Sequence, residues 1–138
     1  MDLSTLDTAE LANQGAALEL RDPAGNPVLQ DDGSPVTLTL LGEDSDVVTQ
    51  ISNRNANQFL RGSAGAGQAI TVEMSRTNEI NKFAAATVAW SGIVVDGEPV
   101  KFSADAAKAL YRRFPWIRDQ VRAFIGDRAN FTKASRKS

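Results

Sequence analysis

Residues 36–40, Val-Thr-Leu-Thr-Leu, constrain the fold more than any other stretch of the chain. Their β-branched and leucine side chains alternate, and this period of two predicts a strand with one buried face. Such a strand needs partners. Residues 17–21 and the short apolar pair 28–29 can supply them, since turn-forming clusters at 22–27 and 31–35 separate the three segments. We therefore expect a small antiparallel sheet that is stable only when another part of the chain packs on it.

Helical spacing of apolar residues predicts two helices before a glycine-rich segment. A short helix is expected from Ser4, as its N-cap, to about Asn13, with Gly15 ending it. A second helix is expected to begin at Asp44 or Ser45, where acidic residues suit a helix start. Its inward face is predicted from residues at helical spacing, which are Val47, Val48, Ile51, Asn55 and Phe59.

A long helix is predicted after the glycine-rich segment, from about Ala69 to Trp90, and Ser91-Gly92 ends it. A hairpin is expected next, with Asp96-Gly97 at its turn. Pro99 restricts the second arm of this hairpin to a sheet edge, because proline has no backbone N–H to donate.

Two further helices are predicted near the C-terminus. Ser103 is the expected N-cap of a helix over residues 104–113, and Asp105 lies in its first turn, where the helix dipole favours a carboxylate. Pro115 fits the first position of a last helix that runs to about Ile125, since the N–H that proline lacks is not needed there.

Together these elements predict one α+β domain over residues 1–138, with a small N-terminal antiparallel β element followed by a mainly helical part. Residues 1–61 form the β-rich part and one helix, residues 62–68 a glycine-rich loop, and residues 69–131 the helical part. Residues 132–138 are expected to form a flexible basic tail. A chain of 138 residues can bury a core of its own.

The sequence contains neither cysteine nor histidine, which excludes much catalytic and metal-binding chemistry. Without cysteine there is no disulfide, thiolate metal site or thiol nucleophile. Without histidine the chain lacks the usual general base near neutral pH and the commonest metal ligand. We therefore expect a protein that is not an enzyme and that binds no metal or cofactor.

Two local patterns approach ligand-binding motifs but lack essential parts. Residues 62–67 have the outer glycine spacing of a phosphate-binding loop, yet Gln-Ala at 68–69 replaces the required Lys and Ser or Thr. Ile70 occupies the position of the third glycine in a dinucleotide fingerprint. The carboxylates at 31–32 and 43–46 lack the ligand spacing of a calcium loop, and they suit a turn and a helix start.

Charge is distributed unevenly along the sequence. Residues 1–69 carry three basic and ten acidic side chains, whereas residues 70–138 carry twelve basic and seven acidic ones. Such a split would allow two faces to bind different partners, or copies of the chain to associate head to tail.

Basic and aromatic residues are interleaved from Tyr111 to Arg128, a composition found on nucleic-acid-binding surfaces. The other interpretation is a pair of amphipathic helices whose aromatic residues lie in the core. A pI of about 5.1 disfavours a dedicated nucleic-acid-binding protein, so we favour a protein partner. Trp90 and Trp116 suit a core or an interface, with the core favoured. The predicted partner-binding residues are Tyr111, Arg112, Arg113, Trp116, Arg118 and Arg122.

Four stretches that together cover most of the chain carry a family resemblance. They are the β-rich opening with its turns at 22–27 and 31–35, LLGEDS at 40–45, AWSGI at 89–93 with Asp96-Gly97 and Phe102-Ser103, and a C-terminal group of ALY at 109–111, PWIRDQV at 115–121 and DRANF at 127–131. In this order they resemble the tail assembly chaperones of tailed bacteriophages and their relatives. None of the stretches is a catalytic signature.

The resemblance implies a non-enzymatic role in which the protein binds the long tape-measure protein, keeps it soluble and helps to recruit tail-tube subunits. It also implies action in the cytoplasm of the host bacterium. No signal peptide and no apolar run of ~20 residues is found, so we expect no membrane association. Two alternatives are a structural tail or head–tail component of the virion and a small nucleic-acid-binding regulator.

Overall fold

The computed structural model describes residues 2–3, 7–64 and 72–132 of the chain. Its helices and strands, with a short 3₁₀ helix (η2) as the last element, are α1 (Thr8–Gln14), β1 (Ala16–Glu19), β2 (Thr37–Leu40), α2 (Asp46–Ala64), α3 (Val72–Ala86), β3 (Thr87–Ser91), β4 (Val94–Val95), β5 (Glu98–Pro99), α4 (Ala104–Arg113), α5 (Pro115–Gly126) and η2 (Arg128–Phe131).

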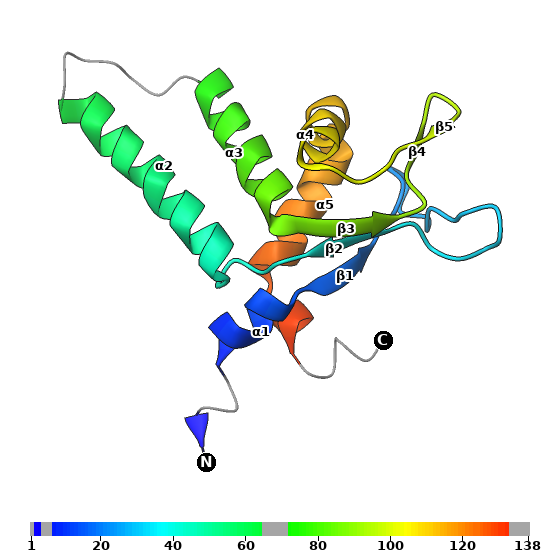
Figure 1. Cartoon of the computed structure of the whole chain (residues 1–138), viewed down its shortest axis with the longest axis horizontal. Coiled ribbons are helices and arrows are strands. Elements are labelled where there is room, and N and C mark those ends of the chain that lie inside the picture. Colours follow the sequence, from blue (N-terminus) through cyan, green and yellow to red (C-terminus); the bar gives the residue numbers. More distant parts are fainter. Residues whose placement is uncertain (1, 4–6, 65–71, 133–138) are drawn as a thin grey trace.

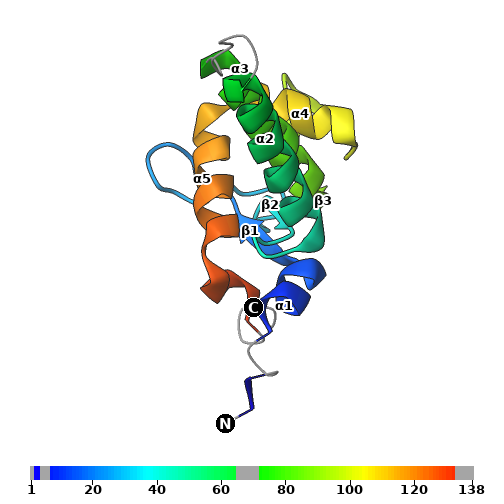
Figure 2. The same cartoon turned by 90° about the vertical axis from the view of Figure 1, so that its left-hand side faces the viewer.

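These elements form an α+β fold in which helices pack on one face of a sheet (Figure 1). The sheet is antiparallel with the strand order β1-β2-β3, and β4 and β5 form a separate hairpin. Helix α3 packs against α4 and α5, which lie on either side of it in Figure 2. Helix α2 leans away from the sheet and from this helical layer (Figure 1).

The core lies between the sheet and the helices and is centred on β2. Leu38 and Leu40 are completely buried, whereas Thr37 and Thr39 on the opposite face are half-buried, which confirms the alternation predicted for this strand. Burying one large apolar side chain contributes roughly 1.5–3 kcal/mol. The other members of the core cluster are Leu20, Val36, Ile80, Phe83, Ala84, Ile93, Ala107, Leu110, Tyr111, Ile117, Val121 and Ile125.

The three residues that follow β2 connect the sheet to three other elements. Their backbone N–H groups donate in turn to three carbonyls: Leu41 to Ala86 at the end of α3 (2.8 Å), Gly42 to Ala12 of α1 (3.1 Å) and Glu43 to Ile125 of α5 (2.9 Å). The chain can approach α1 this closely only because residue 42 is glycine. A Cβ at Gly42 would lie 2.9 Å from the Cβ of Ala12.

Four predicted cap and turn signals are confirmed. The Ser103 hydroxyl caps α4 by accepting from the N–H of Ala106 (3.0 Å), and Pro115 is the first residue of α5. The β4–β5 hairpin turns at Asp96-Gly97, where both residues have positive φ angles, and Gly15 ends α1 with a φ of 80°.

The helix predicted over residues 69–90 is wrong at its C-terminal end, because α3 ends at Ala86 and Thr87–Ser91 form β3. Two β-branched residues open this strand, and pairing with β2 outweighs the helical propensity of the preceding alanines. In the ladder Trp90 lies opposite Leu38. The sheet therefore takes one strand from the middle of the chain, so the β element is not confined to the N-terminal part.

The start of the first helix also differs from the prediction. Asp7 is its N-cap, because Oδ1 of this residue accepts from the N–H groups of Ala9 (3.1 Å) and Glu10 (3.2 Å). Ser4, the predicted cap, lies outside the described residues. Aspartate is as good an N-cap as serine, so a cap one turn later stabilises a shorter helix equally well.

The glycine-rich loop predicted at residues 62–68 begins later, because α2 continues through Gly62 to Ala64. Adding a residue to a helix that has already formed is easier than starting one, so a glycine costing about 1 kcal/mol does not end it. Residues 65–71 lie outside the described residues. So do residues 133–138, most of the predicted basic tail.

The first strand is shorter than the predicted residues 17–21, since β1 ends at Glu19. The N–H of Leu20 still donates to the Val36 carbonyl (2.9 Å), but the backbone of Arg21 bonds to the Gln120 side chain of α5, which accepts from the Arg21 N–H (2.9 Å) and donates to the Arg21 carbonyl (2.7 Å). The apolar pair 28–29 forms no full strand, and Leu29 makes only an isolated bridge with Pro35.

A hydroxyl pair joins α4 to the start of β3 inside the core. The Thr87 hydroxyl donates to the Phe83 carbonyl (2.7 Å) and lies 2.6 Å from the Tyr111 hydroxyl. Since the single proton of Thr87 is already used, Tyr111 is the donor of the second bond. Burial raises the pKa of Tyr111 to about 12.

This raised pKa predicts a loss of stability at alkaline pH. Tyr111 is the only tyrosine, so its ultraviolet titration reports it directly, and we expect a midpoint near 12 in the folded chain against 10.0 once it unfolds. Because the folded state holds the proton more tightly, the stabilisation is complete below pH 10 and is lost as the pH rises through 12. The difference amounts to about 2–3 kcal/mol. Tyr111→Phe should remove this part of the pH dependence, and a phenol that titrates near 10 in folded protein would contradict the prediction.

Candidate functional site

The six residues predicted to contact a partner do not form one surface. They occur on α4 (Tyr111, Arg112 and Arg113), in the first turn of α5 (Trp116 and Arg118) and in the middle of α5 (Arg122). The prediction for Tyr111 is corrected, because its side chain is completely buried and its ring packs edge-on against Phe83 at a centroid distance of 6.3 Å. The other five are exposed or half-buried.

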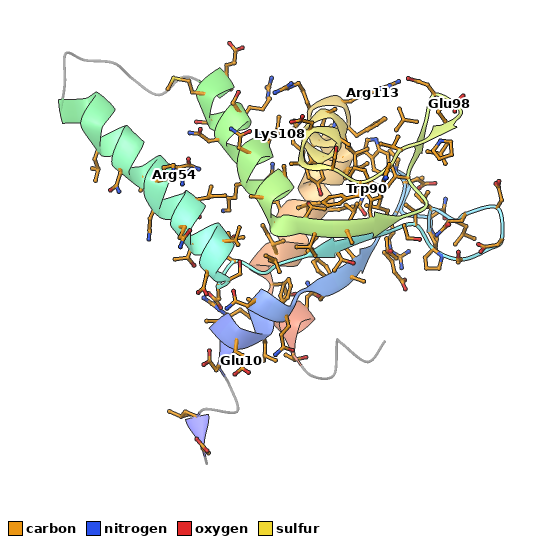
Figure 3. All side chains as sticks on the ribbon, viewed as in Figure 1. Glu10, Arg54, Trp90, Glu98, Lys108 and Arg113 are labelled. Atoms are coloured by element: carbon orange, nitrogen blue, oxygen red, sulfur yellow. The ribbon has the colours of Figure 1, made fainter. Side chains whose placement is uncertain are left out.

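Arg113 forms an ion pair with the β4–β5 hairpin. Its guanidinium donates twice to the Asp96 carboxylate (2.7 and 2.9 Å) and lies over the Phe114 ring, 5.2 Å from its centroid. The hydrogen bonds lower the pKa of Asp96 and raise that of Arg113. In Figure 3, Arg113 lies on the same side of the molecule as Glu98, which is the first residue of β5 in this hairpin. Both partners are exposed, so the pair orients the hairpin more than it stabilises the fold.

Arg118 holds the corner between α4 and α5. Its guanidinium donates to the carbonyl of Tyr111 (2.7 Å) and more weakly to that of Arg112 (3.4 Å). The last carbonyls of a helix have no partner within the helix, and a nearby cation satisfies them and interacts well with the helix dipole. Arg118 therefore acts as a C-terminal cap for α4.

Arg122 connects α5 to α3. Its guanidinium donates through Nε (3.1 Å) and through a second nitrogen to the Glu79 carboxylate, and also to Asp119 one turn earlier (2.9 Å). These hydrogen bonds raise the pKa of Arg122. Arg113, Arg118 and Arg122 thus all have partners within the chain, which reduces the positive charge that the basic and aromatic stretch offers to phosphate groups.

Trp116 lines a different kind of candidate site, an open apolar groove with a volume of about 720 Å³. Its floor consists of core residues, and its walls come from the 28–32 loop, β4, the end of α4 and the start of α5. Two wall residues, Leu29 and Val94, are 57% and 59% exposed. The lining residues are Leu20, Val28, Leu29, Gln30, Asp31, Asp32, Val36, Gly92, Ile93, Val94, Val95, Leu110, Phe114, Trp116 and Ile117.

Aromatic and acidic side chains give the groove its character. The Phe114 and Trp116 rings pack edge to face at 6.0 Å, which fixes the wall that joins the two helices. Among the described residues that line the groove, Asp31 and Asp32 are the only charged ones, so the groove is negative at this end. Hydrogen bonds from Ser34 lower the pKa of Asp32 and keep it ionised.

The loop wall is held in place by Gln30. Its side-chain NH₂ group donates to the Pro35 carbonyl (3.1 Å) and the Ser91 hydroxyl (3.1 Å), so the loop is fixed to the end of β3. Gly92 makes this possible. A Cβ at Gly92 would lie 2.4 Å from Cδ of Gln30, and the φ of 83° is one that side chains rarely adopt.

Sequence reasoning missed Leu29, Val94 and Phe114 as groove residues. Leu29 carries a usable signal, because it is a large apolar residue between two turn-forming clusters, where polar residues are expected. Val94 is next to the core residue Ile93 in the sequence, and Phe114 lies three residues from the core residues Tyr111 and Ile117. Only the fold shows that they face the groove.

A second recess of about 470 Å³ lies between α2, α3 and α5. Most of its lining residues are polar or charged, although apolar atoms make up most of its exposed surface. We refer to it as the helical cleft, and its lining residues are Glu43, Asn55, Ala56, Ser75, Asn78, Glu79, Lys82, Phe83, Arg122 and Ile125.

The carboxylates that the sequence groups together are separated by the fold. Glu43 pairs with Lys82 (3.0 Å), and Asp44 pairs with Arg128 (2.5 and 2.9 Å). Asp46 accepts at the start of α2 from the side-chain amide of Asn13 (3.4 Å). Among the described residues, no three His, Cys, Asp or Glu side chains converge as metal ligands would. In this part of the chain no helix is long and apolar enough to span a bilayer.

A scan of protein-family models, a search of curated proteins and a search of solved structures found no match to this chain.

The contact between Gly92 and Gln30 predicts unequal costs for two glycine substitutions. Gly97→Ala introduces only the strain of a positive φ, about 1–2 kcal/mol, because no atom lies within 4 Å of the new Cβ. Gly92→Ala adds displacement of Gln30 and should cost about 1–3 kcal/mol more in the free energy of unfolding. Denaturant unfolding measures both. In a Gln30→Ala background the two glycine substitutions should become equal, and a difference that persists there would exclude the contact as its cause.

Because Arg118 caps α4, replacing Arg118 should destabilise the protein more than replacing Arg112. Arg118→Met keeps the apolar stem but removes the donors, and we expect a loss of about 1–3 kcal/mol in the free energy of unfolding. The matched change Arg112→Met removes an exposed charge and should stay within about 0.5 kcal/mol of the parent. Equal effects of the two variants in thermal or denaturant unfolding would show that Arg118 does not cap α4.

Proposed function

We propose that the protein is a non-enzymatic chaperone of phage tail assembly that binds a helical segment of the tape-measure protein in the apolar groove. It would act in the cytoplasm of the host bacterium and help tail-tube subunits assemble on its partner. The observation that carries this proposal is the open groove of about 720 Å³ with exposed Leu29 and Val94 on its walls.

The shape and chemistry of the groove suit an amphipathic helix. Apolar side chains repeated at i, i+3 or i+4 would insert between the 28–32 loop and the aromatic corner of Phe114 and Trp116. Large exposed apolar residues around a recess are typical of protein-binding sites. The acidic rim at Asp31 and Asp32 favours a helix that carries a basic residue beside its apolar stripe.

The sequence resemblance to tail assembly chaperones supports the same function independently of the groove. A protein that keeps a long helical partner soluble must cover apolar stripes that recur along it, and a shallow groove that accepts any apolar helical turn suits this task. Several shallow contacts along one partner also bind more strongly together than each does alone.

Co-expression with the tape-measure protein encoded by the same phage tests the proposal. We expect the parent chain to co-purify with this protein and to increase its soluble fraction. Leu29→Glu and Val94→Glu put a charge on the groove wall and should reduce the co-purified amount about tenfold or more. Val88→Glu changes another exposed valine, on β3, and should leave binding unchanged. Failure of the parent to co-purify, or groove variants that behave like Val88→Glu, would refute the proposal.

Analysis of purified phage particles distinguishes a chaperone from a component of the virion. A chaperone is released before the particle is complete, so mass spectrometry of virions should find no stoichiometric amount of the chain. A fixed number of copies per particle would overturn the chaperone assignment and favour the structural alternative.

A further inference from the structure

A tight turn holds the acidic end of the groove in place. The N–H of Gln30 donates to the Ser34 carbonyl (2.7 Å), and the N–H of Gly33 donates to the Gln30 carbonyl (2.9 Å). The Gln30 side chain also bonds to the end of β3, so residues 30–34 form a turn that is fixed to the sheet. Asp31 therefore has a defined position on the groove wall.

The two carboxylates of this turn differ in their bonds. Oδ1 of Asp32 accepts from the N–H (2.9 Å) and from the hydroxyl (2.5 Å) of Ser34, so Asp32 closes the turn. Asp31 is exposed, and its carboxylate forms no hydrogen bond or ion pair with another described residue. A carboxylate beside an apolar groove, with all of its acceptor positions free, can bind a cation that a partner carries.

The basic side chains near the groove are directed elsewhere. Arg113 is paired with the β4–β5 hairpin, and Arg118 donates to carbonyls at the end of α4. The side chain of Arg112 lies about 200° around α4 from the lining residue two positions earlier. Arg21 donates to the Gly25 carbonyl in the preceding turn (3.0 Å). None of the described lining residues is basic, so the free carboxylate has no competing cation within the groove.

We propose that Asp31 determines which helices the groove accepts: it binds a Lys or Arg that lies within one turn of the partner's apolar stripe, and it repels an Asp or Glu at that place. Apolar residues at i, i+3 or i+4, and i+7 would fill the groove, and the cation would lie beside them at the loop wall. This role of Asp31 rests on the helix-binding groove of the proposed function and defines the chemistry required of the partner.

Charge and apolar contact have separate effects in such a site. The apolar surface supplies most of the affinity but distinguishes poorly between one apolar helix and another. An exposed ion pair changes affinity by only about two- to fivefold, but a like charge at the same position weakens binding by a similar factor, so the two effects add between a basic and an acidic partner. The acidic wall also disfavours nucleic acids and anionic lipids, because their phosphate groups are negative as well.

Binding of three model peptides to the full chain tests this role. Each peptide is an amphipathic helix of about 20 residues with the same leucine stripe, and the residues one turn beyond each end of the stripe are Lys, Gln or Glu. In fluorescence anisotropy we expect the Lys peptide to bind about two- to fivefold more tightly than the Gln peptide, and the Glu peptide to bind about two- to fivefold more weakly. The preference for Lys should decrease as added salt screens the charges.

Three substitutions that remove a single charge assign the preference to a residue. Asp31→Asn keeps the size of the side chain, and it should abolish the difference between the Lys and Gln peptides while leaving the dissociation constant of the Gln peptide unchanged. Asp32→Asn can still accept both bonds from Ser34 and should retain most of the preference. Glu10→Gln is the matched control, since it removes a carboxylate from α1, away from the groove (Figure 3), and should leave all three dissociation constants unchanged.

Three outcomes would overturn the role of Asp31. They are equal dissociation constants for the three peptides, a preference for Lys that survives Asp31→Asn or that Asp32→Asn removes, and no binding of any peptide at high micromolar concentration.

The proposed function has a separate readout, which is co-purification with the tape-measure protein. If that protein co-purifies while the peptides show no charge preference, only the role of Asp31 fails. If the peptides show the preference and the tape-measure protein does not co-purify, the proposed function fails, and the groove binds a basic amphipathic helix of another partner.

Discussion

Three successive backbone amides, at residues 41–43, hold the parts of this molecule together. They follow the central strand β2 directly, and they bond to the end of α3, to α1 and to α5. A short strand thereby positions helices that are far apart in the sequence. The groove and the helical cleft both depend on this arrangement, because α5 contributes Trp116 and Ile117 to the groove and Arg122 and Ile125 to the cleft.

Elements with a strong local signal could be predicted from the sequence. The alternation at 36–40, the Ser103 cap and Pro115 each determine a local structure without help from distant residues. The end of α3 could not be predicted in this way. Residues 84–90 carry no glycine or proline to mark a change from helix to strand, and only the ladder with β2 decides that Thr87 is extended.

The candidate site was harder to predict than the fold for a related reason. The arginines of α4 and α5 form an evident basic and aromatic pattern, but their partners lie elsewhere in the chain: Arg122 bonds to Glu79, 43 residues away. The uneven charge of the sequence is reduced in the same way, since Glu43 and Asp44 of the acidic part pair with Lys82 and Arg128 of the basic part. The groove combines four segments, and no local pattern joins them.

The change from α3 to β3 without a connecting loop has a mechanical consequence. Ala86 ends the helix, Thr87 begins the strand, and the Thr87 hydroxyl bonds back to Phe83 in the last helical turn. The C-terminal end of helix α3 is therefore fixed to the sheet. Helix α2 begins close to the same sheet, since its N-cap Ser45 lies five residues after the end of β2. A change in the angle between α2 and α3 would therefore act on the β2–β3 pair and on residues 41–45, which join β2 to α2, and the register shift between Thr39 and Leu40 lies next to this junction.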